Sequence, residues 1–161
     1  MGPNVTITQR GPGAQQVRNS LDAIMKMEVL VGIPQAKTIR PKDKINNSSL
    51  LYIHTHGSPM RNIPARPVIE PAIEADGNKQ AIAAELKQAV KAQFDGEPQQ
   101  AKQFMRRAGT AGSNAAKAWF TDARNNWAPN SPETIRRKGS SRPLIDTSAL
   151  RRSITFVVRD I

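Results

Sequence analysis

Apolar residues recur at helical spacing in three parts of the chain. An apolar stripe predicts an amphipathic helix over residues 14–26, and it consists of Val17, Leu21, Ile24 and Met25. A longer stripe predicts a helix that begins near Pro67 or Val68 and ends before residues 95–98. Residues 76–78 weaken this helix in the middle and can split it in two. A third helix is predicted from Pro98 to about Asn125, with a face of small residues that another helix of the same chain or of a neighbouring subunit can approach closely.

Short β-prone runs predict strands at residues 5–8, 27–33 and 154–159. Residues 46–49 offer helix N-cap chemistry, and Gly57 can end a short helix between them in the left-handed conformation. A strand over residues 50–53 is the alternative, because so short an apolar run does not fix its own period. A turn or single helical turn is predicted from Asp146 or Thr147 through Leu150.

The remaining segments are polar or rich in proline. We predict an extended loop over residues 34–47 and an extended arm over residues 128–142, both within a single domain spanning residues 1–161. Hydrophobic residues make up 38% of the chain and aromatic residues 4%. This content is low for a self-sufficient monomer, so we expect part of the stabilising burial to lie between subunits.

The chain carries 24 Lys and Arg against 13 Asp and Glu, a formal net charge of +11. Such an excess suits an acidic partner: nucleic acid, a membrane surface or an acidic protein face. Two basic groups stand out as candidate partner-facing or DNA-facing positions: Lys37, Arg40, Lys42 and Lys44 in the loop, and Arg136, Arg137 and Lys138 in the arm. The alternative function that they support is non-sequence-specific binding to nucleic-acid phosphates.

Catalytic and metal-binding patterns are weak. His54 and His56 are the chain's two histidines and there is no cysteine, so a zinc site would need carboxylates that no cluster supplies. Glu70 and Glu74 share the face of an ordinary amphipathic helix. No histidine lies near Ser148 or Ser153 in sequence to form a hydrolase triad. We therefore predict a protein that is not an enzyme and needs no cofactor. The apolar pattern holds no signal peptide or membrane span, and predicts a soluble, cytoplasmic chain without a membrane partner.

Two stretches resemble the tail-completion and virion-morphogenesis proteins of tailed bacteriophages. The first runs from the Val-Gly-Ile turn at Gly32 through His54-Thr55-His56-Gly57 to the segment that contains Pro64, Arg66 and Pro67. The family shows a His-Glu-Phe-Gly-like turn and Ile-Pro-Ala-Arg-Pro-Phe-Leu there, so the acid, the aromatic and the last two residues differ. The prolines stiffen the entry to the long helix, and Arg66 is placed where it can pair with a carboxylate.

The second stretch resembles the family's closing Leu-x-x-Thr-Gly-x-Leu-x-x-Ser-Ile segment. Ser148 replaces the usual glycine, and serine lacks the conformational freedom of glycine, so the resemblance does not fix the backbone shape of this turn. The matching residues, with the aspartate that opens the turn, are Leu144, Asp146, Thr147, Leu150, Ser153 and Ile154. Trp127 and residues 131–134 resemble the arm of relatives from Mu-like phages.

The resemblance implies an α+β fold: a small mixed or antiparallel sheet flanked by two or three helices, with long extended loops. It also implies assembly into a homo-oligomeric ring, a hexamer if it matches the tail tube. The expected function is structural. The chain would be a tail terminator or tail-completion (neck) protein that caps the tail tube, joins it to the head connector and lets DNA pass. The expected location is the virion, after assembly in the host cytoplasm.

Overall fold

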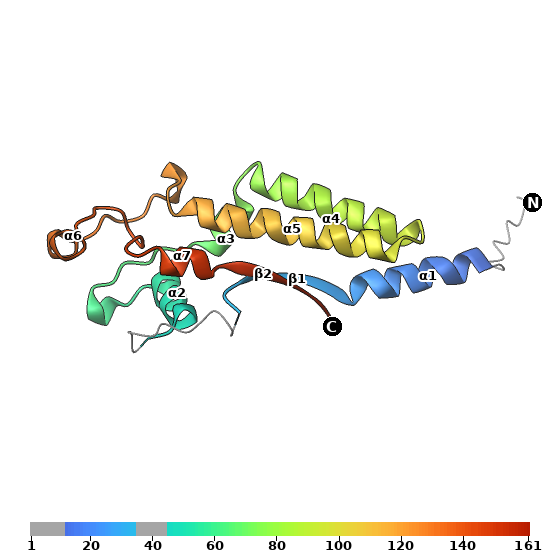
Figure 1. Ribbon diagram of the computed structural model, residues 1–161, viewed down its shortest axis with the longest axis horizontal. Coiled ribbons are helices and arrows are strands. Elements are labelled where there is room, and N and C mark those ends of the chain that lie inside the picture. The colour runs from blue at the N-terminus through green and yellow to red at the C-terminus, as the bar shows by residue number, and fades with distance from the viewer. Residues whose placement is uncertain (1–11, 35–44) are drawn as a thin grey trace, which may run out of the picture.

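A computed structural model describes residues 12–34 and 45–161. Within these residues the fold is α+β, as expected, with seven α-helices, two short 3-10 helices and a two-stranded antiparallel sheet (Figure 1). The strand predicted at residues 5–8 and the basic loop residues Lys37, Arg40, Lys42 and Lys44 lie outside the described residues. The elements in order are α1 (Pro12–Met25), β1 (Met27–Gly32), α2 (Asn47–His56), η2 (Pro59–Arg61), α3 (Ile69–Glu74), α4 (Asn78–Phe94), α5 (Pro98–Trp119), η3 (Ala123–Asn125), α6 (Pro132–Lys138), α7 (Ala149–Ser153) and β2 (Thr155–Asp160).

The molecule is elongated. Helices α4 and α5 form a hairpin above the sheet, α1 extends beyond it at one end, and α2, α6 and α7 gather at the other (Figure 1). The predicted split of the long helix is confirmed: Gly77, with φ of 84°, breaks it between α3 and α4. Helix α5 runs unbroken past Gly109 and Gly112 but ends at Trp119, earlier than predicted, because Asp122 starts a new turn.

The sheet joins two strands that are distant in sequence. β1 pairs with β2 in a register that sets Val31 opposite Phe156 and Leu30 opposite Val157. Successive side chains of a strand point to opposite faces. Val31 and Phe156 pack on α5, at Gly112 and Gly109 respectively, so the small-residue face of α5 is covered by the same chain. Leu30 and Val157 point to the other face, where 42% and 41% of their surface is exposed.

The main core lies between α3, the end of α5 and α7. Its two largest fully buried side chains are Val68 and Ile154, which come from the two resembling stretches. The other buried members of this cluster are Leu51, Ala72, Ala116, Trp119, Phe120 and Leu150. The core therefore fixes the relative position of two stretches that are far apart in sequence.

Candidate functional site

The two resembling stretches meet at the end of the molecule where α2, α6 and α7 gather (Figure 1). Together with the arm they line one cavity of about 750 Å³, which we call the motif cavity. Half of the sequence-predicted site residues line it: His54, Pro64, Arg66, Arg137, Lys138, Leu144, Asp146, Thr147 and Leu150. The cavity is the candidate functional site.

The first wall is formed by α2 and by residues 62–66, which follow its terminal turn. Element α2 is a helix and not the alternative strand. Asn46 caps it by accepting a hydrogen bond from the Ser49 amide at 2.8 Å. Gly57 ends it with φ of 73° and ψ of −179°. The φ of Gly57 is positive, as predicted, but its ψ is not that of the left-handed helical conformation, so the prediction is wrong in this angle. Glycine alone occupies this backbone region readily. A Cβ atom here would lie 2.8 Å from the Ala65 nitrogen, so the returning chain also excludes a side chain.

Arg66 connects the first stretch to the arm. Only 6% of this residue is exposed. Its Nε donates to the Ala128 carbonyl at 3.0 Å, and its Nη2 donates to the carbonyls of Ala128 at 2.8 Å and Pro129 at 3.0 Å. The expected carboxylate partner is thus replaced by two backbone oxygens, because the arm passes directly over the guanidinium. Burial lowers the pKa of Arg66, yet an arginine keeps its charge at any ordinary pH.

Two further side chains hold the arm, and no pattern in the sequence predicts this role for them. Trp127 donates from Nε1 to the Pro67 carbonyl at 3.0 Å. The buried Asn130 donates from Nδ2 to the carbonyls of Ser141 at 3.2 Å and Arg142 at 3.1 Å. A buried asparagine in a polar, proline-rich stretch has no distinctive sequence pattern, so only the structure reveals that it closes a loop.

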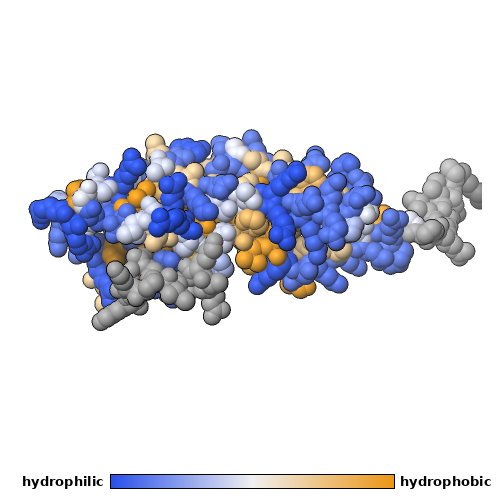
Figure 2. Space-filling view, viewed as in Figure 1, coloured by the Kyte–Doolittle hydropathy of each residue, from blue (hydrophilic) through white to orange (hydrophobic). Residues whose placement is uncertain are grey.

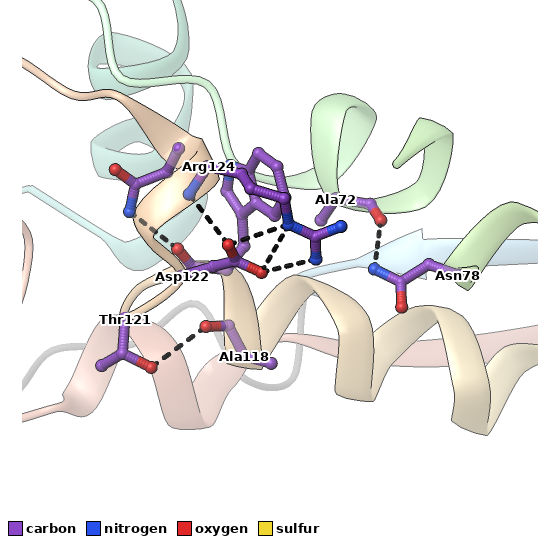
Figure 3. A network of polar contacts seen from close by, with 8 residues as sticks. Ala72, Asn78, Ala118, Thr121, Asp122 and Arg124 are labelled. Atoms are coloured by element: carbon purple, nitrogen blue, oxygen red, sulfur yellow. Dashed lines mark hydrogen bonds and ion pairs between the residues drawn. The ribbon is translucent and has the colours of Figure 1, made fainter. Parts of the chain in front are cut away.

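A compact polar network turns the chain from α5 towards the arm (Figure 3). The Asp122 carboxylate accepts hydrogen bonds from the Arg124 backbone amide at 2.9 Å and from its guanidinium at 2.6 Å. These bonds hold the pKa of Asp122 at about 2. Asn125 donates to the Trp119 carbonyl at 2.9 Å. The network thereby sets the direction in which residues 127–131 leave α5.

The arm over residues 128–142 is not extended throughout, which corrects the prediction. It contains α6, capped at one end by Ser131, whose hydroxyl accepts from the Thr134 amide at 3.2 Å, and at the other by Gly139 in the left-handed conformation. The Ser-Pro-Glu-Thr sequence at residues 131–134 is a helix-start signal that the proline-rich composition obscured. Arg136, Arg137 and Lys138 form the last turn of α6, where cations are favourable.

The second wall contains the turn before α7. Ser148 has φ of 60° and ψ of 10°, the left-handed conformation that glycine favours. The turn therefore keeps the shape that a glycine would give it. The helical turn begins at Ala149, later than predicted, and Ser153 closes it by donating from Oγ to the Leu150 carbonyl at 2.7 Å. Arg151 donates to the Lys117 carbonyl at 2.8 Å, which ties α7 to α5.

The cavity is lined by more positive than negative charge. Among the described residues that line it, Arg66, Arg137 and Lys138 carry positive charge and Asp146 is the single carboxylate. Burial lowers the pKa of Lys138, while Asp146 opposes that effect. Burial, followed by the charges of Arg66 and Lys138, lowers the pKa of His54 to about 4, so this histidine is neutral at pH 7. Its Nδ1 is buried and has no hydrogen-bond partner in the described part of the chain.

The other predicted site residues lie elsewhere. Gly32 ends β1, and a Cβ atom there would meet nothing within 4 Å, so neither its surroundings nor a positive φ demands glycine. Pro67 accepts the Trp127 hydrogen bond, and Arg136 is exposed outside the cavity. Gly57 shapes the backbone near the cavity and Ser153 hydrogen-bonds through its Oγ to the Leu150 carbonyl, but neither residue lines the cavity.

The side chains that the sequence suggested for metal or acid–base chemistry are not gathered in the motif cavity, apart from His54. His56 is exposed and contacts the Tyr52 carbonyl through Nδ1 at 2.9 Å, and Glu74 pairs with Lys79 at 2.5 Å. Residues 12–34 and 45–161 contain no group of three or more His, Cys, Asp or Glu side chains that could hold a metal ion. No helix in these ranges is long and apolar enough to span a membrane. Comparison with family models, curated proteins and solved structures finds no match for this chain.

Proposed function

We propose that this chain is a structural protein of the bacteriophage head–tail junction. It acts as a tail terminator or tail-completion ring that caps the tail tube, joins it to the head connector and leaves a channel for DNA. The observation that carries the proposal is the motif cavity: the two stretches that resemble this family are far apart in sequence and fold around one feature. In this proposal the chain is not an enzyme.

The turn at Ser148 supports the same proposal. The resembling family carries glycine at this position, and Ser148 adopts the backbone conformation that glycine supplies. A non-glycine residue in this conformation costs roughly 1–2 kcal/mol, so the surrounding structure must impose the turn. Although serine replaces glycine at residue 148, the backbone of the turn has the conformation that a glycine there would favour.

Exposed apolar surface supports self-association. On α1, Val17, Leu21 and Met25 are 52%, 46% and 69% exposed, although they form the apolar stripe of an amphipathic helix. Figure 2 shows apolar side chains gathered over the strands within a mainly hydrophilic surface. An amphipathic helix gains most of its stability by burying its stripe. We propose that the stripe of α1 packs against a second copy of the chain, and that head-to-tail contacts of this kind close into a ring.

The first experiment measures the mass of the purified protein by light scattering across concentration, followed by negative-stain imaging. The proposal predicts annular particles, with sixfold symmetry if they match a tail tube. Leu21→Glu is expected to abolish them, whereas Gln16→Glu, an equal charge change at another exposed position of α1, leaves them intact. A chain that remains a monomer at every concentration contradicts the self-assembling ring.

The second candidate is a basic protein that binds nucleic acid without sequence preference. Arg136 and Arg137 favour it, since both are exposed in the last turn of α6. Binding to duplex DNA would weaken steeply with salt and would fall when these two arginines are replaced by glutamine. Strong DNA binding by a persistent monomer would favour this candidate over the ring.

A further inference from the structure

We propose that the motif cavity is a binding site for a carboxylate side chain, presented by an acidic segment of a different protein. The proposal stands on three observations: a buried arginine without a carboxylate partner, an excess of cations around the cavity, and apolar walls that fit a peptide. It deepens the proposed function and rests on it only for the partner, a neighbouring virion protein. The recognition chemistry stands on its own.

Arg66 is the centre of the site. The residue as a whole is 6% exposed, and the hydrogen bonds of its guanidinium go to backbone carbonyls that carry no net charge. Those bonds use Nε and Nη2, which leaves the N–H groups of Nη1 without a partner among the described residues. Burying a charge without a counter-ion is costly, and guanidinium groups bind carboxylates strongly. A carboxylate entering the cavity would compensate this buried charge.

Within residues 12–34 and 45–161, the charges that line the cavity around Arg66 are not balanced. Lys138 donates from Nζ to the Arg142 carbonyl at 2.9 Å, so its ammonium group is also held by a neutral oxygen. Arg137 adds a third cation to the lining, and Asp146 is the one carboxylate that the described residues contribute. Neutral His54 adds no charge at pH 7. One further carboxylate would bring the lining closer to neutrality than any neutral ligand could.

The walls favour a peptide over a phosphate. Leu50, Ile63, Leu144 and Leu150 line the same cavity as the cations, together with Pro64, Pro129 and Pro132. Apolar lining with a few polar groups is typical of sites that take an apolar ligand with one polar anchor. An acidic side chain flanked by apolar residues matches both parts of the lining, whereas a sugar-phosphate backbone matches only the cations.

The net charge favours a different protein as the source of the carboxylate. With 24 Lys and Arg against 13 Asp and Glu, a second copy offers this site more cations than carboxylates, whereas an acidic protein surface complements it. The site lies at the end of the elongated molecule opposite α1, whose apolar stripe we assign to self-association (Figure 1). The two surfaces can therefore be occupied at the same time.

The test uses a short blocked peptide with one glutamate between leucines, and its glutamine analogue, in calorimetric titrations of the full chain. Inorganic phosphate and a short DNA duplex are the competing probes. We expect the glutamate peptide to bind about tenfold more tightly than the glutamine peptide. Binding should also raise the pKa of His54, measured by NMR of its ring protons and assigned with His56→Asn.

Matched variants separate the site from general charge. Arg137→Gln and Lys138→Gln are each expected to weaken the glutamate peptide several-fold and leave the glutamine peptide unchanged. Arg136→Gln, which removes the same charge from the next residue of α6 outside the cavity, should leave both unchanged. These substitutions lie on α6, whose residues are not fully buried, so the fold should persist.

Equal binding of the two peptides, no detectable binding of either, or equal loss with Arg136→Gln would overturn the proposal. So would tighter binding of phosphate or DNA at the same residues, which would support the nucleic-acid candidate instead. The outcome is independent of ring formation. If the protein forms rings but does not prefer the glutamate peptide, the proposed function stands and this inference is wrong. If a persistent monomer prefers the glutamate peptide, this inference stands and the self-assembling ring is contradicted.

Discussion

The ring of Phe156 occupies the space that a side chain on Gly109 would need. A Cβ atom on Gly109 would lie 2.2 Å from Cδ2 and 2.5 Å from Cγ of that ring. Glycine in the middle of a helix ordinarily costs about 1 kcal/mol relative to alanine, yet here it allows a strand to lie directly against α5. The contact fixes the depth at which the sheet meets the helix.

Gly109→Ala is therefore expected to lower the free energy of unfolding by about 1–3 kcal/mol, because the clash outweighs the gain in helix propensity. Urea unfolding followed by circular dichroism measures the change. Gly13→Ala on α1, where a Cβ atom meets nothing within 4 Å, should cause no loss. Adding Phe156→Leu should make the Gly109→Ala effect smaller; a cost that is purely additive would contradict the contact.

Gly57→Ala is expected to destabilise the protein by at least about 2 kcal/mol. The positive φ and the approach of the Ala65 nitrogen and the Ile63 carbonyl act together at this position. Gly139→Ala provides the control, because its φ of 67° is also positive but its surroundings are open. It should cost about 1 kcal/mol, and Gly139→Asn should cost less. Equal costs at the two glycines would show that the crowding around Gly57 is not real.

Ser148→Gly is expected to raise the free energy of unfolding by up to about 1 kcal/mol. Glycine removes the strain of the left-handed conformation, and the greater entropy of the unfolded chain offsets part of the gain. Ser148→Val should destabilise, because a β-branched side chain fits this conformation worst. Thermal and urea unfolding of the three proteins would give the order Gly, Ser, Val; any other order would contradict the turn geometry.

His54 is expected to make the stability depend on pH. Its pKa of about 4 in the folded chain lies below the ordinary value of 6.5. Between these values the unfolded chain binds more protons, so the free energy of unfolding falls as the pH decreases from about 6.5 to about 4. His54→Asn should flatten this part of the curve. The exposed His56 is the control, and a slope that disappears with His56→Asn instead would refute the assignment.

Periodicity predicted most of the elements because local patterns determine them. The apolar stripes located α1 and α4, and Asp76-Gly77-Asn78 marked the break between α3 and α4. Helix α6 was missed because the Pro-Ser-Arg composition of the arm outweighed a short capping signal at Ser131. Elements of two turns bury little apolar surface, so they leave a weak periodic pattern.

The site was predictable in part. The resemblance selected His54, Arg66 and Asp146, which do line one cavity. It did not predict that Arg66 would bind the carbonyls of Ala128 and Pro129, since a backbone acceptor leaves no mark in the sequence. The roles of Asn130 and Trp127 depend on how the arm folds back, a tertiary property that no local pattern encodes.

The pairing of β1 with β2 has a consequence for the order of folding. Glu28 and Arg159, which bond across the two strands, are 131 positions apart. Closing so long a loop reduces the entropy of the chain, and this loss must occur before any contact between the strands can stabilise the fold. The α4–α5 hairpin, whose contacts are local, needs no such closure. We therefore expect the hairpin to form early in refolding and the sheet to consolidate last.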